Sequence, residues 1–349
     1  MSDDESDDAA PSRLKPRRRR RERGRGDRVL DGLWRLRLPL PWPGVPHGNS
    51  WAVRSCNGIV LFDTGIHEEQ TDEHPSSWSE LEHAMGQVGL RPSDINLVVC
   101  THAHADHYGQ AAPIVDLTGS ELWMHPDHAH TTKMADPEGS LQRRMEVAMH
   151  SGVPEKAIQA YQQARRSMPT GVAEAIEPDR DRVPGDQIDT DLGTWEVHYT
   201  PGHAPSHVTL HQPDRGLLLS GDHLIGRVTL YFDHGWSEDP VAEFLSSLDT
   251  VEQLDAGLCL AGHGRPFRDI QAHIDGNRAE VESELVALRE RMGDGAQTAF
   301  ELLPPDTPPA FATWRLTLTL CFLEHLEKRG EASRETDHDG TERWSAVAS

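Results

Sequence analysis

Short apolar runs separated by turn residues occupy the chain from Val29 onward. The runs VLDGLWRLRL, WAVRSC and GIVLFDTG are bounded by Pro, Gly and Asn, which predicts a meander of strands. The next stretch, SSWSELEHAMGQVGL, spaces its apolar residues three or four positions apart, so we expect a helix there. A short apolar strand, INLVVC, follows, and it leads into the segment THAHADHYGQ and then into an apolar helix. The first part of the chain is therefore expected to be a strand meander followed by a helix, a strand, a second helix and a further strand at ELWMH.

The middle of the chain interrupts this pattern. Residues 126–190 are polar, rich in His, Met and Gln, and helical in spacing, with breaks at Pro154 and Pro169. We expect a helical insertion or lid in this region. Three strands follow in TWEVHYT, HVTLHQ and GLLLSGD, then an amphipathic helix in DPVAEFLSSLDTVEQL, and a last strand, GLCLAG, just before His263. The strand pattern thus resumes after the insertion and ends near residue 267.

Helical patterns replace strands after Phe267. We expect a long charged helix, a helix in AQTAFELL (residues 296–303) and a third in PAFATWRLTLTLCFLEHLEKRG, followed by a hairpin at Asp339-Gly340. Helices followed by a small hairpin predict a winged-helix-like module over residues 268–349. Such a module could be a scaffold for nucleic-acid recognition, or a cap for packing or dimerisation. We favour the cap, because the segment lacks the basic charge that nucleic-acid binding requires.

Charge is distributed unevenly along the 349 residues, which hold 34 basic and 57 acidic side chains for a net charge of −23. Residues 1–28 hold ten basic and seven acidic side chains, so we expect a disordered tail. This tail could tether the protein to nucleic acid or a membrane, but we favour a merely solvated segment. The acidic remainder argues against a broad phosphate-binding face. No apolar stretch suits a membrane helix, no export signal is evident and the four cysteines are isolated, so we expect a cytoplasmic protein with no membrane partner.

Candidate chemistry is concentrated where the strand INLVVC ends. His102, His104, Asp106 and His107 fall within six residues, in the pattern H-A-H-A-D-H. Three imidazoles and a carboxylate on one turn provide the nitrogen and oxygen ligands that suit a divalent ion such as Zn²⁺. The pattern therefore predicts a metal site directly after a buried strand.

Three further metal-competent side chains occupy the same position after later strands. His203 lies in TPGH, Asp222 in LSGD and His263 in LAGH, and each follows an apolar run. Strand ends that gather at one edge of a sheet would bring these side chains together. A core filled with unpaired imidazoles would be costly, so burial of these histidines for packing alone is the weaker explanation.

These motifs resemble those of the metallo-β-lactamase fold superfamily. The matching pieces are LFDTG around Asp63, THAHADH, TPGH, SGD and AGHG, and the resemblance covers about residues 29–267. It implies an α/β fold of the αββα type, in which two mixed sheets pack together, helices lie outside and the site lies at one edge. It also implies a first metal bound by His102, His104 and His203, a second bound by Asp106, His107 and His263, and a bridge between the two at Asp222. We expect two divalent ions, with Zn²⁺ preferred over Fe or Mn.

Comparison with branches of the superfamily favours hydrolysis. His104 stands where the flavodiiron proteins of this fold carry Glu, and Asp222 stands where the antibiotic-degrading branch carries Cys. Two cations would hold one water and lower its pKa from 15.7 toward about 7, and the resulting hydroxide would attack a carbonyl or phosphoryl centre. Asp106 is the expected catalytic residue, because it can orient the hydroxide and later carry a proton to the leaving group. Asp63 is expected to support the metal edge without binding metal.

Other histidines have weaker assignments. His207 is either a donor to a metal ligand or an ordinary strand residue, and we slightly favour the latter. His223 could reach the substrate, although this is the less favoured interpretation. The histidines of the insertion are expected mainly on the surface, and they are His125, His128, His130 and His150.

Two classes of function are consistent with these motifs. The first is a hydrolase acting on a small-molecule ester, thioester or lactone, similar to the glyoxalase II group. The second is a metal-dependent endoribonuclease acting on single-stranded RNA, because the superfamily branch with a winged-helix-like tail includes relatives of a mitochondrial endoribonuclease. A nuclease needs a basic groove, and only the amino-terminal tail is strongly basic. We therefore expect a small-molecule substrate, keep nucleic acid as a less favoured partner, and leave a homodimer open.

Overall fold

Two mixed sheets and a small hairpin form the strands of this protein. The computed structural model describes residues 22–42, 44–130, 136–166, 168–181, 183–293, 295–309 and 312–347. The first sheet has seven strands in the spatial order β1 to β7; β1 to β4 pair antiparallel, and β4 to β7 run parallel. Its strands are β1 (Arg25–Leu30), β2 (Leu33–Trp42), β3 (Val45–Ser55), β4 (Gly58–Phe62), β5 (Ile95–Val99), β6 (Glu121–Met124) and β7 (Arg180–Asp181).

The second sheet has five strands in the order β12-β11-β10-β9-β8. β11 and β12 are parallel, whereas the other neighbours are antiparallel. Its strands are β8 (Gln187–Thr190), β9 (Gly193–Tyr199), β10 (Val208–Gln212), β11 (Leu217–Gly221) and β12 (Leu258–Ala261). The hairpin near the carboxyl end consists of β13 (Ala332–Thr336) and β14 (Glu342–Ala346).

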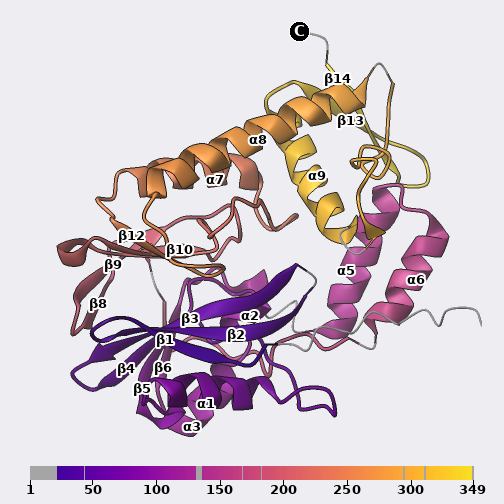
Figure 1. Cartoon of the computed structure of the whole chain (residues 1–349). Helices are drawn as coiled ribbons and strands as arrows, with labels where there is room; N and C mark the ends of the chain where they lie inside the picture. Colours follow the sequence, from indigo (N-terminus) through magenta and orange to yellow (C-terminus); the bar gives the residue numbers. More distant parts are fainter. Residues whose placement is uncertain are drawn as a thin grey trace, which may run out of the picture.

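Helices cover the outer faces of both sheets (Figure 1). The hydrophobic side chains of α1 and α3 pack on the first sheet, and those of α7 and α8 pack on the second. The α-helices are α1 (Ser77–Gln87), α2 (Ala105–Tyr108), α3 (Ala111–Thr118), α5 (Pro137–His150), α6 (Glu155–Arg165), α7 (Pro240–Glu252), α8 (Ile270–Met292) and α9 (Ala312–Lys328). Two 3₁₀ turns, η1 (Pro92–Asp94) and η2 (Pro213–Arg215), precede β5 and β11.

An apolar layer between the sheets forms the centre of the fold. Successive side chains of a strand point to opposite faces, so Trp51 and Val53 of β3 face the second sheet while Ala52 faces the helices. Trp51 and Trp195 are fully buried in the layer between the sheets. Burial of a large apolar side chain contributes about 1.5–3 kcal/mol. Helix, sheet, sheet and helix thus follow one another, and the predicted α/β sandwich of the αββα type is confirmed.

The sandwich positions several strand ends at one edge. Because β4 runs parallel to β5 and β11 runs parallel to β12, the carboxyl ends within each pair point the same way. Asn49 of β3 joins the two sheets there, because its backbone N–H donates to Gly262 O at 2.7 Å and its side-chain amide donates to Ala261 O at 2.8 Å. The residues that follow these strands therefore share one edge of the molecule.

The described chain differs from three of the sequence predictions. Strand β1 begins at Arg25 and pairs with β2, so the predicted tail boundary at residue 28 is wrong; residues 1–21 of that tail lie outside the described residues. The predicted helix at 296–303 is wrong, because these residues form turns and a bridge from Gln297 to Trp344. The insertion at 126–190 contains α5 and α6, but it also contains β7 and β8, which belong to the two sheets.

The segment after β12 contains α8, α9 and the β13–β14 hairpin, so two of its three predicted helices and the predicted hairpin are present. Trp344 of β14 is fully buried in the cluster that α7, α8 and α9 share. The insertion packs on the same cluster through Val147 and Val153, and the backbone N–H of Phe300 donates to Ser151 O at 3.0 Å. The winged-helix-like character of residues 268–349 stays a prediction. Among the helices of the described ranges, none is long and apolar enough to cross a membrane.

Candidate metal centre

A sharp change of backbone conformation after β5 presents the first candidate ligands. His104 has an extended conformation, with φ −70° and ψ 152°, and it precedes the short helix α2. His102 lies in the bend between β5 and α2, whereas Asp106 and His107 lie on the first turn of α2. One six-residue segment thus directs its side chains to two neighbouring groups.

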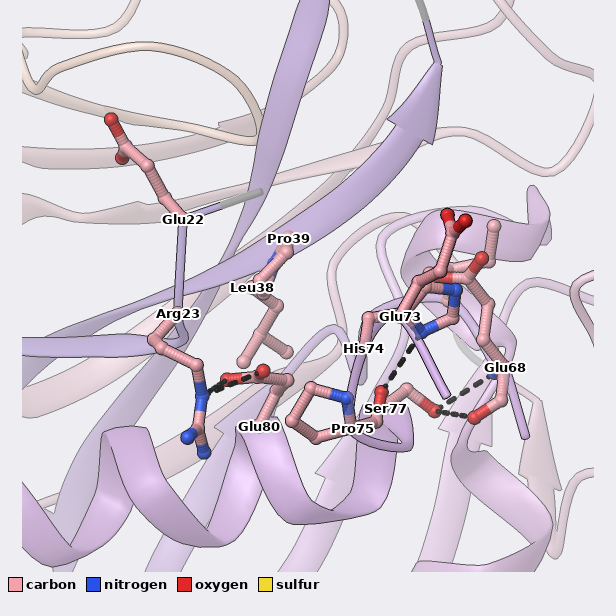
Figure 2. Close-up of a pocket in the computed structure, with 11 residues that line it drawn as sticks. Glu22, Arg23, Leu38, Pro39, Glu68, Glu73, His74, Pro75, Ser77 and Glu80 are labelled. Carbon is pink, nitrogen blue, oxygen red and sulfur yellow. Dashed lines mark hydrogen bonds and ion pairs between the residues drawn. The ribbon is translucent and has the colours of Figure 1, made fainter. Parts of the chain in front are cut away.

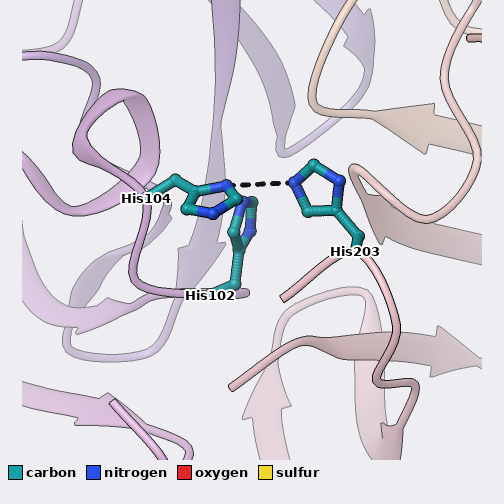
Figure 3. A group of neighbouring side chains, drawn as sticks. All are labelled: His102, His104 and His203. Atoms are coloured by element: carbon teal, nitrogen blue, oxygen red, sulfur yellow. Dashed lines mark hydrogen bonds between the residues drawn. The ribbon is translucent and has the colours of Figure 1, made fainter. Parts of the chain in front are cut away.

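The first group consists of His102, His104 and His203 (Figure 3). His104 Nδ1 lies 3.0 Å from His102 Nε2 and 3.0 Å from His203 Nε2. The other ring nitrogens are occupied elsewhere, because His102 Nδ1 contacts Thr101 Oγ1 at 3.0 Å and His203 Nδ1 contacts Tyr231 O at 3.1 Å. The three nitrogens that face one another are therefore the ones left for a shared ligand.

The second group consists of Asp106, His107, Asp222 and His263. His263 Nε2 lies 3.1 Å from Asp106 Oδ2 and 3.1 Å from Asp222 Oδ2, and His107 Nε2 lies 3.3 Å from Asp222 Oδ1. Asp222 also connects the two groups, because its Oδ2 is 3.7 Å from His203 Nε2. All seven side chains predicted as ligands therefore lie at this edge. Within each group, one candidate ligand atom per residue lies within 4.8 Å of the others.

Two buried atoms test whether this group suits a cation. His107 Nε2 and Asp222 Oδ1 are buried, and neither has a hydrogen-bond partner among the described residues. A buried polar atom without a partner costs about 1–3 kcal/mol, so native proteins rarely leave one. Imidazole nitrogens and carboxylate oxygens are the ligands that Zn²⁺ and related ions prefer. The arrangement therefore fits metal ions at both groups.

The protonation preferences of His203 and Asp222 agree with this fit. Burial lowers the pKa of His203 to about 4, and His104 adds to the effect, so the ring is neutral at pH 7. Burial alone would raise the pKa of Asp222, but His263 and His107 outweigh it and hold the pKa well below its ordinary value. Neutral imidazole and ionised carboxylate are the forms that bind metal. Burial lowers the pKa of His263, but Asp222 and Asp106 raise it to about 10, and a bound cation would replace that proton.

Asp63, directly after β4, supports the second group through a hydrogen bond to His107. Its Oδ2 accepts a hydrogen bond from His107 Nδ1–H at 2.8 Å, and its Oδ1 accepts one from the Thr101 backbone N–H at 2.8 Å. Asp63 has a φ of +61°, a conformation that costs a non-glycine residue free energy and is concentrated at functional sites. The carboxylate orients His107 and leaves its Nε2 for a ligand, in the supporting position that the sequence predicts.

His207 and His223 both differ from expectation. His207 is not the ordinary strand residue that the sequence slightly favoured, and His223 is not placed to contact a substrate. His207 Nε2 accepts a hydrogen bond from the Asp222 backbone N–H at 3.1 Å, so His207 holds a candidate ligand in place and is not an ordinary strand residue. His223 is buried and packs edge-on against Phe244, with ring centroids 4.9 Å apart. His223 therefore faces α7 and not an open surface.

Asp233 is a supporting residue that sequence reasoning missed. Its Oδ2 accepts a hydrogen bond from His104 Nε2–H at 2.8 Å, which leaves His104 Nδ1 to face the other two histidines. His130 of the insertion lies 3.5 Å from the same oxygen through Nδ1, and its Nε2 contacts Ser206 Oγ at 2.9 Å. The expectation that the insertion histidines lie mainly on the surface is thus wrong for His125 and His130, which are buried. Asp233 directly follows the apolar run at 230–232, the pattern that also precedes Asp222 and His263, so this run is the signal that could have found it.

Two glycines allow the strand ends to approach the ligands closely. A Cβ atom at Gly262, after β12, would lie 2.2 Å from Asp222 Oδ1 and 2.7 Å from His107 Cε1. A Cβ atom at Gly221, which has a φ of +49°, would lie 2.7 Å from His207 Nε2. Glycine is therefore required before Asp222 and before His263, because any larger residue would collide with the neighbouring side chains.

A separate pocket lies between α1, β2 and the segment after β4. Figure 2 shows the Arg23–Glu80 ion pair and the Ser77–Glu68 hydrogen bonds that border it. The lining residues include none of the seven candidate ligands. The pocket is therefore distinct from the metal edge.

Comparison with known proteins identifies the family of this chain. Residues 43–263 match the metallo-beta-lactamase superfamily. Among curated relatives, the probable metallo-hydrolase YqjP of Bacillus subtilis is 26% identical over 281 residues, which cover 76% of this chain and 82% of the relative. The hydroxyacylglutathione hydrolase GloC of Haemophilus influenzae is 27% identical over 190 residues, which cover 53% of this chain and 76% of the relative.

A solved structure extends the similarity to nearly the whole chain. The crystal structure of a metallo-beta-lactamase family protein from Thermus thermophilus superposes with a TM-score of 0.77 and 26% identity, covering 92% of this chain and 100% of that one. The match extends beyond residue 263, so it includes part of the segment after β12. The chain therefore belongs to the metallo-β-lactamase superfamily.

Proposed function

We propose that this protein is a metal-dependent hydrolase that cleaves an ester, thioester or lactone bond of a small molecule. The observation that carries the proposal is the convergence of the seven predicted ligands, in which His107 Nε2 and Asp222 Oδ1 are buried, lack a hydrogen bond to any described residue and lie 3.3 Å apart. His102, His104 and His203 would hold one divalent ion, Asp106, His107 and His263 a second, and Asp222 would bridge both.

Two bound Zn²⁺ ions, or Fe or Mn in their place, would supply a Lewis acid and a water of lowered pKa. Asp106 is the proposed catalytic residue of the chain itself, because its carboxylate lies inside the second group and can orient the attacking water and then return its proton to the leaving group. Asp222 would hold the two groups in register through its contacts to His263 and His203. Tyr231 lies beside the first group, with its ring centroid 5.4 Å from that of His203, and would form one wall of the site.

The charge of the protein supports a small substrate over RNA. Outside residues 1–28 the chain holds 24 basic and 50 acidic side chains, so its body would repel a polyanion. The similarity to the hydroxyacylglutathione hydrolase supports a thioester among the candidate bonds. We therefore rank a thioester, ester or lactone above RNA as the substrate.

A hydrolysis panel tests this proposal. Tag-free protein purified without chelator is incubated with thioesters, esters and lactones, and in parallel with labelled single-stranded RNA. We expect hydrolysis within the small-molecule panel, its loss together with bound metal in His104→Ala, and its loss in Asp106→Asn. The matched control is His83→Gln, which alters an exposed histidine on α1 and should retain full activity.

Two results would contradict the proposal. RNA cleavage that His102→Ala abolishes, without small-molecule hydrolysis, would reverse the ranking of substrates. Metal stoichiometry that is unchanged in His104→Ala would overturn the assignment of the first group.

A further inference from the structure

A second cluster of metal-competent side chains lies on the outer face of the second sheet. Glu196 and His198 belong to β9, and His211 belongs to β10. In the antiparallel register His211 is directly opposite Glu196, and His198 is the diagonal neighbour. Since Val197 of β9 faces the layer between the sheets, the alternation of side chains directs these three to the opposite face.

The atoms of this cluster are placed for a shared ligand. One ligand atom from each of Glu196, His198 and His211 lies within 4.8 Å of the other two, and His198 Nε2 is 3.8 Å from Glu196 Oε2. His198 Nε2 is buried, and the part of the chain that the structure describes offers it no hydrogen-bond partner. The cluster thus contains a buried imidazole nitrogen that makes no hydrogen bond to the described residues.

The surroundings of His211 favour metal binding. His211 is buried, and its Nε2–H donates a long hydrogen bond of 3.4 Å to Asp255 O. Metal-binding histidines usually donate their second ring nitrogen to a carbonyl or carboxylate in this way, which leaves the first nitrogen for the ion.

We propose that Glu196, His198 and His211 bind one transition-metal ion of the Zn²⁺ type. Two imidazoles and one carboxylate form a three-residue set that zinc uses in proteins, and the partial exposure of Glu196 and His198 leaves room for water as a fourth ligand. The site is separate from the metal edge. His207, which contacts Asp222 at the metal edge, directly precedes β10, and His211 lies four residues further along the chain, about 13 Å from His207 at the rise of a β-strand. The bound ion would join β9 to β10 from outside.

Metal titration of selected variants tests this site. Tag-free protein is stripped with chelator and titrated with Zn²⁺ against a chromophoric competitor, which yields the number of sites and each Kd. We expect His198→Gln and Glu196→Gln to bind one Zn²⁺ equivalent fewer, or to bind that equivalent at least tenfold more weakly. His83→Gln, the matched surface control, should retain the full number. These variants alter partly exposed side chains, so they avoid the misfolding that a change at buried His211 could cause.

The readouts separate this site from the proposed active site. Hydrolysis by His198→Gln should equal that of the unchanged protein, and His104→Ala should lose hydrolysis while it keeps the outer equivalent. Equal site numbers and Kd values in the unchanged protein, His198→Gln and Glu196→Gln would overturn the outer site and leave the hydrolase proposal intact. An equal loss in His83→Gln would also overturn it, because it would indicate adventitious binding to surface histidines.

Discussion

The change Gly262→Ala tests the geometry of the metal edge without altering any ligand. Gly262 follows β12, and its φ is not in the left-handed region, so the backbone tolerates alanine. The added Cβ atom, however, would lie 2.2 Å from Asp222 Oδ1 and 2.7 Å from His107 Cε1. The substitution therefore acts on Asp222 and His107, the two side chains whose buried atoms lack a hydrogen bond among the described residues.

The magnitude follows from these distances. Ordinary contacts begin near ~3.4 Å, so the Asp222 carboxylate must move by about 1 Å to accommodate the new methyl group. A misplacement of about 1 Å at a reacting centre costs on the order of 100-fold in rate. Crowding of a packed site also costs about 1–3 kcal/mol of unfolding free energy. We expect kcat/KM to fall by about 100-fold and the affinity for metal by about 10- to 100-fold.

The assay combines metal titration, hydrolysis of the best substrate of the panel, and urea unfolding. Gly257→Ala is the matched control, because it lies at the other end of β12 and its Cβ atom would have only an ordinary contact, 3.9 Å from Gly216 O. Gly257→Ala should retain activity and metal affinity. Full activity and metal affinity in Gly262→Ala would refute the reasoning, since the ligands would then not need the positions described above.

Three further predictions concern residues that support the fold or the site. Asp233→Asn removes the carboxylate charge that orients His104, so metal affinity should fall about 10- to 100-fold while the circular dichroism spectrum stays unchanged. Unchanged metal affinity would contradict the supporting role of Asp233. Asp63→Asn tolerates the left-handed φ but cannot accept every hydrogen bond of the carboxylate, so urea unfolding should show a loss of about 1–3 kcal/mol and metal titration a weaker second group. Asp239 caps α7 and contacts His325. Burial alone would raise the pKa of Asp239, but the hydrogen bonds from His325 and from the helix N–H outweigh burial and lower that pKa. The ionised form therefore stabilises the fold above about pH 4, and this contribution is lost as the pH falls through the lowered pKa. Asp239→Ala should cost about 1 kcal/mol at pH 7, with a gap that narrows in acid; a gap independent of pH would contradict this.

The candidate ligands could be predicted because each one follows an apolar strand. His102, His203, Asp222 and His263 all lie within a few residues of a strand end. Parallel pairing aligns the ends of β4 with β5 and of β11 with β12, and β9 runs in the same direction as β11 because β10 lies antiparallel between them. This information is local in sequence, and the superfamily resemblance adds the pairing into two groups. The sandwich and the positions of the seven side chains were therefore accessible from the sequence.

The supporting residues were not accessible, because their roles depend on long-range packing. Asp233 lies in an irregular segment between β11 and α7, and only the tertiary fold brings it to His104, 129 positions away. His130 lies in a polar stretch, which predicts an exposed side chain, yet it is buried beside Asp233. The apolar spacing at 296–303 predicts a short helix, but these residues form turns and a bridge to Trp344. In each case tertiary contacts decide what local patterns leave open.

The most direct test of the account is a crystal structure of protein purified without chelator, with anomalous diffraction measured at the zinc, iron and manganese edges. The account predicts two peaks, one among His102, His104 and His203 and one among Asp106, His107 and His263, with Asp222 between them. Absence of anomalous density at both positions, with the seven side chains paired only to one another, would contradict the central claim.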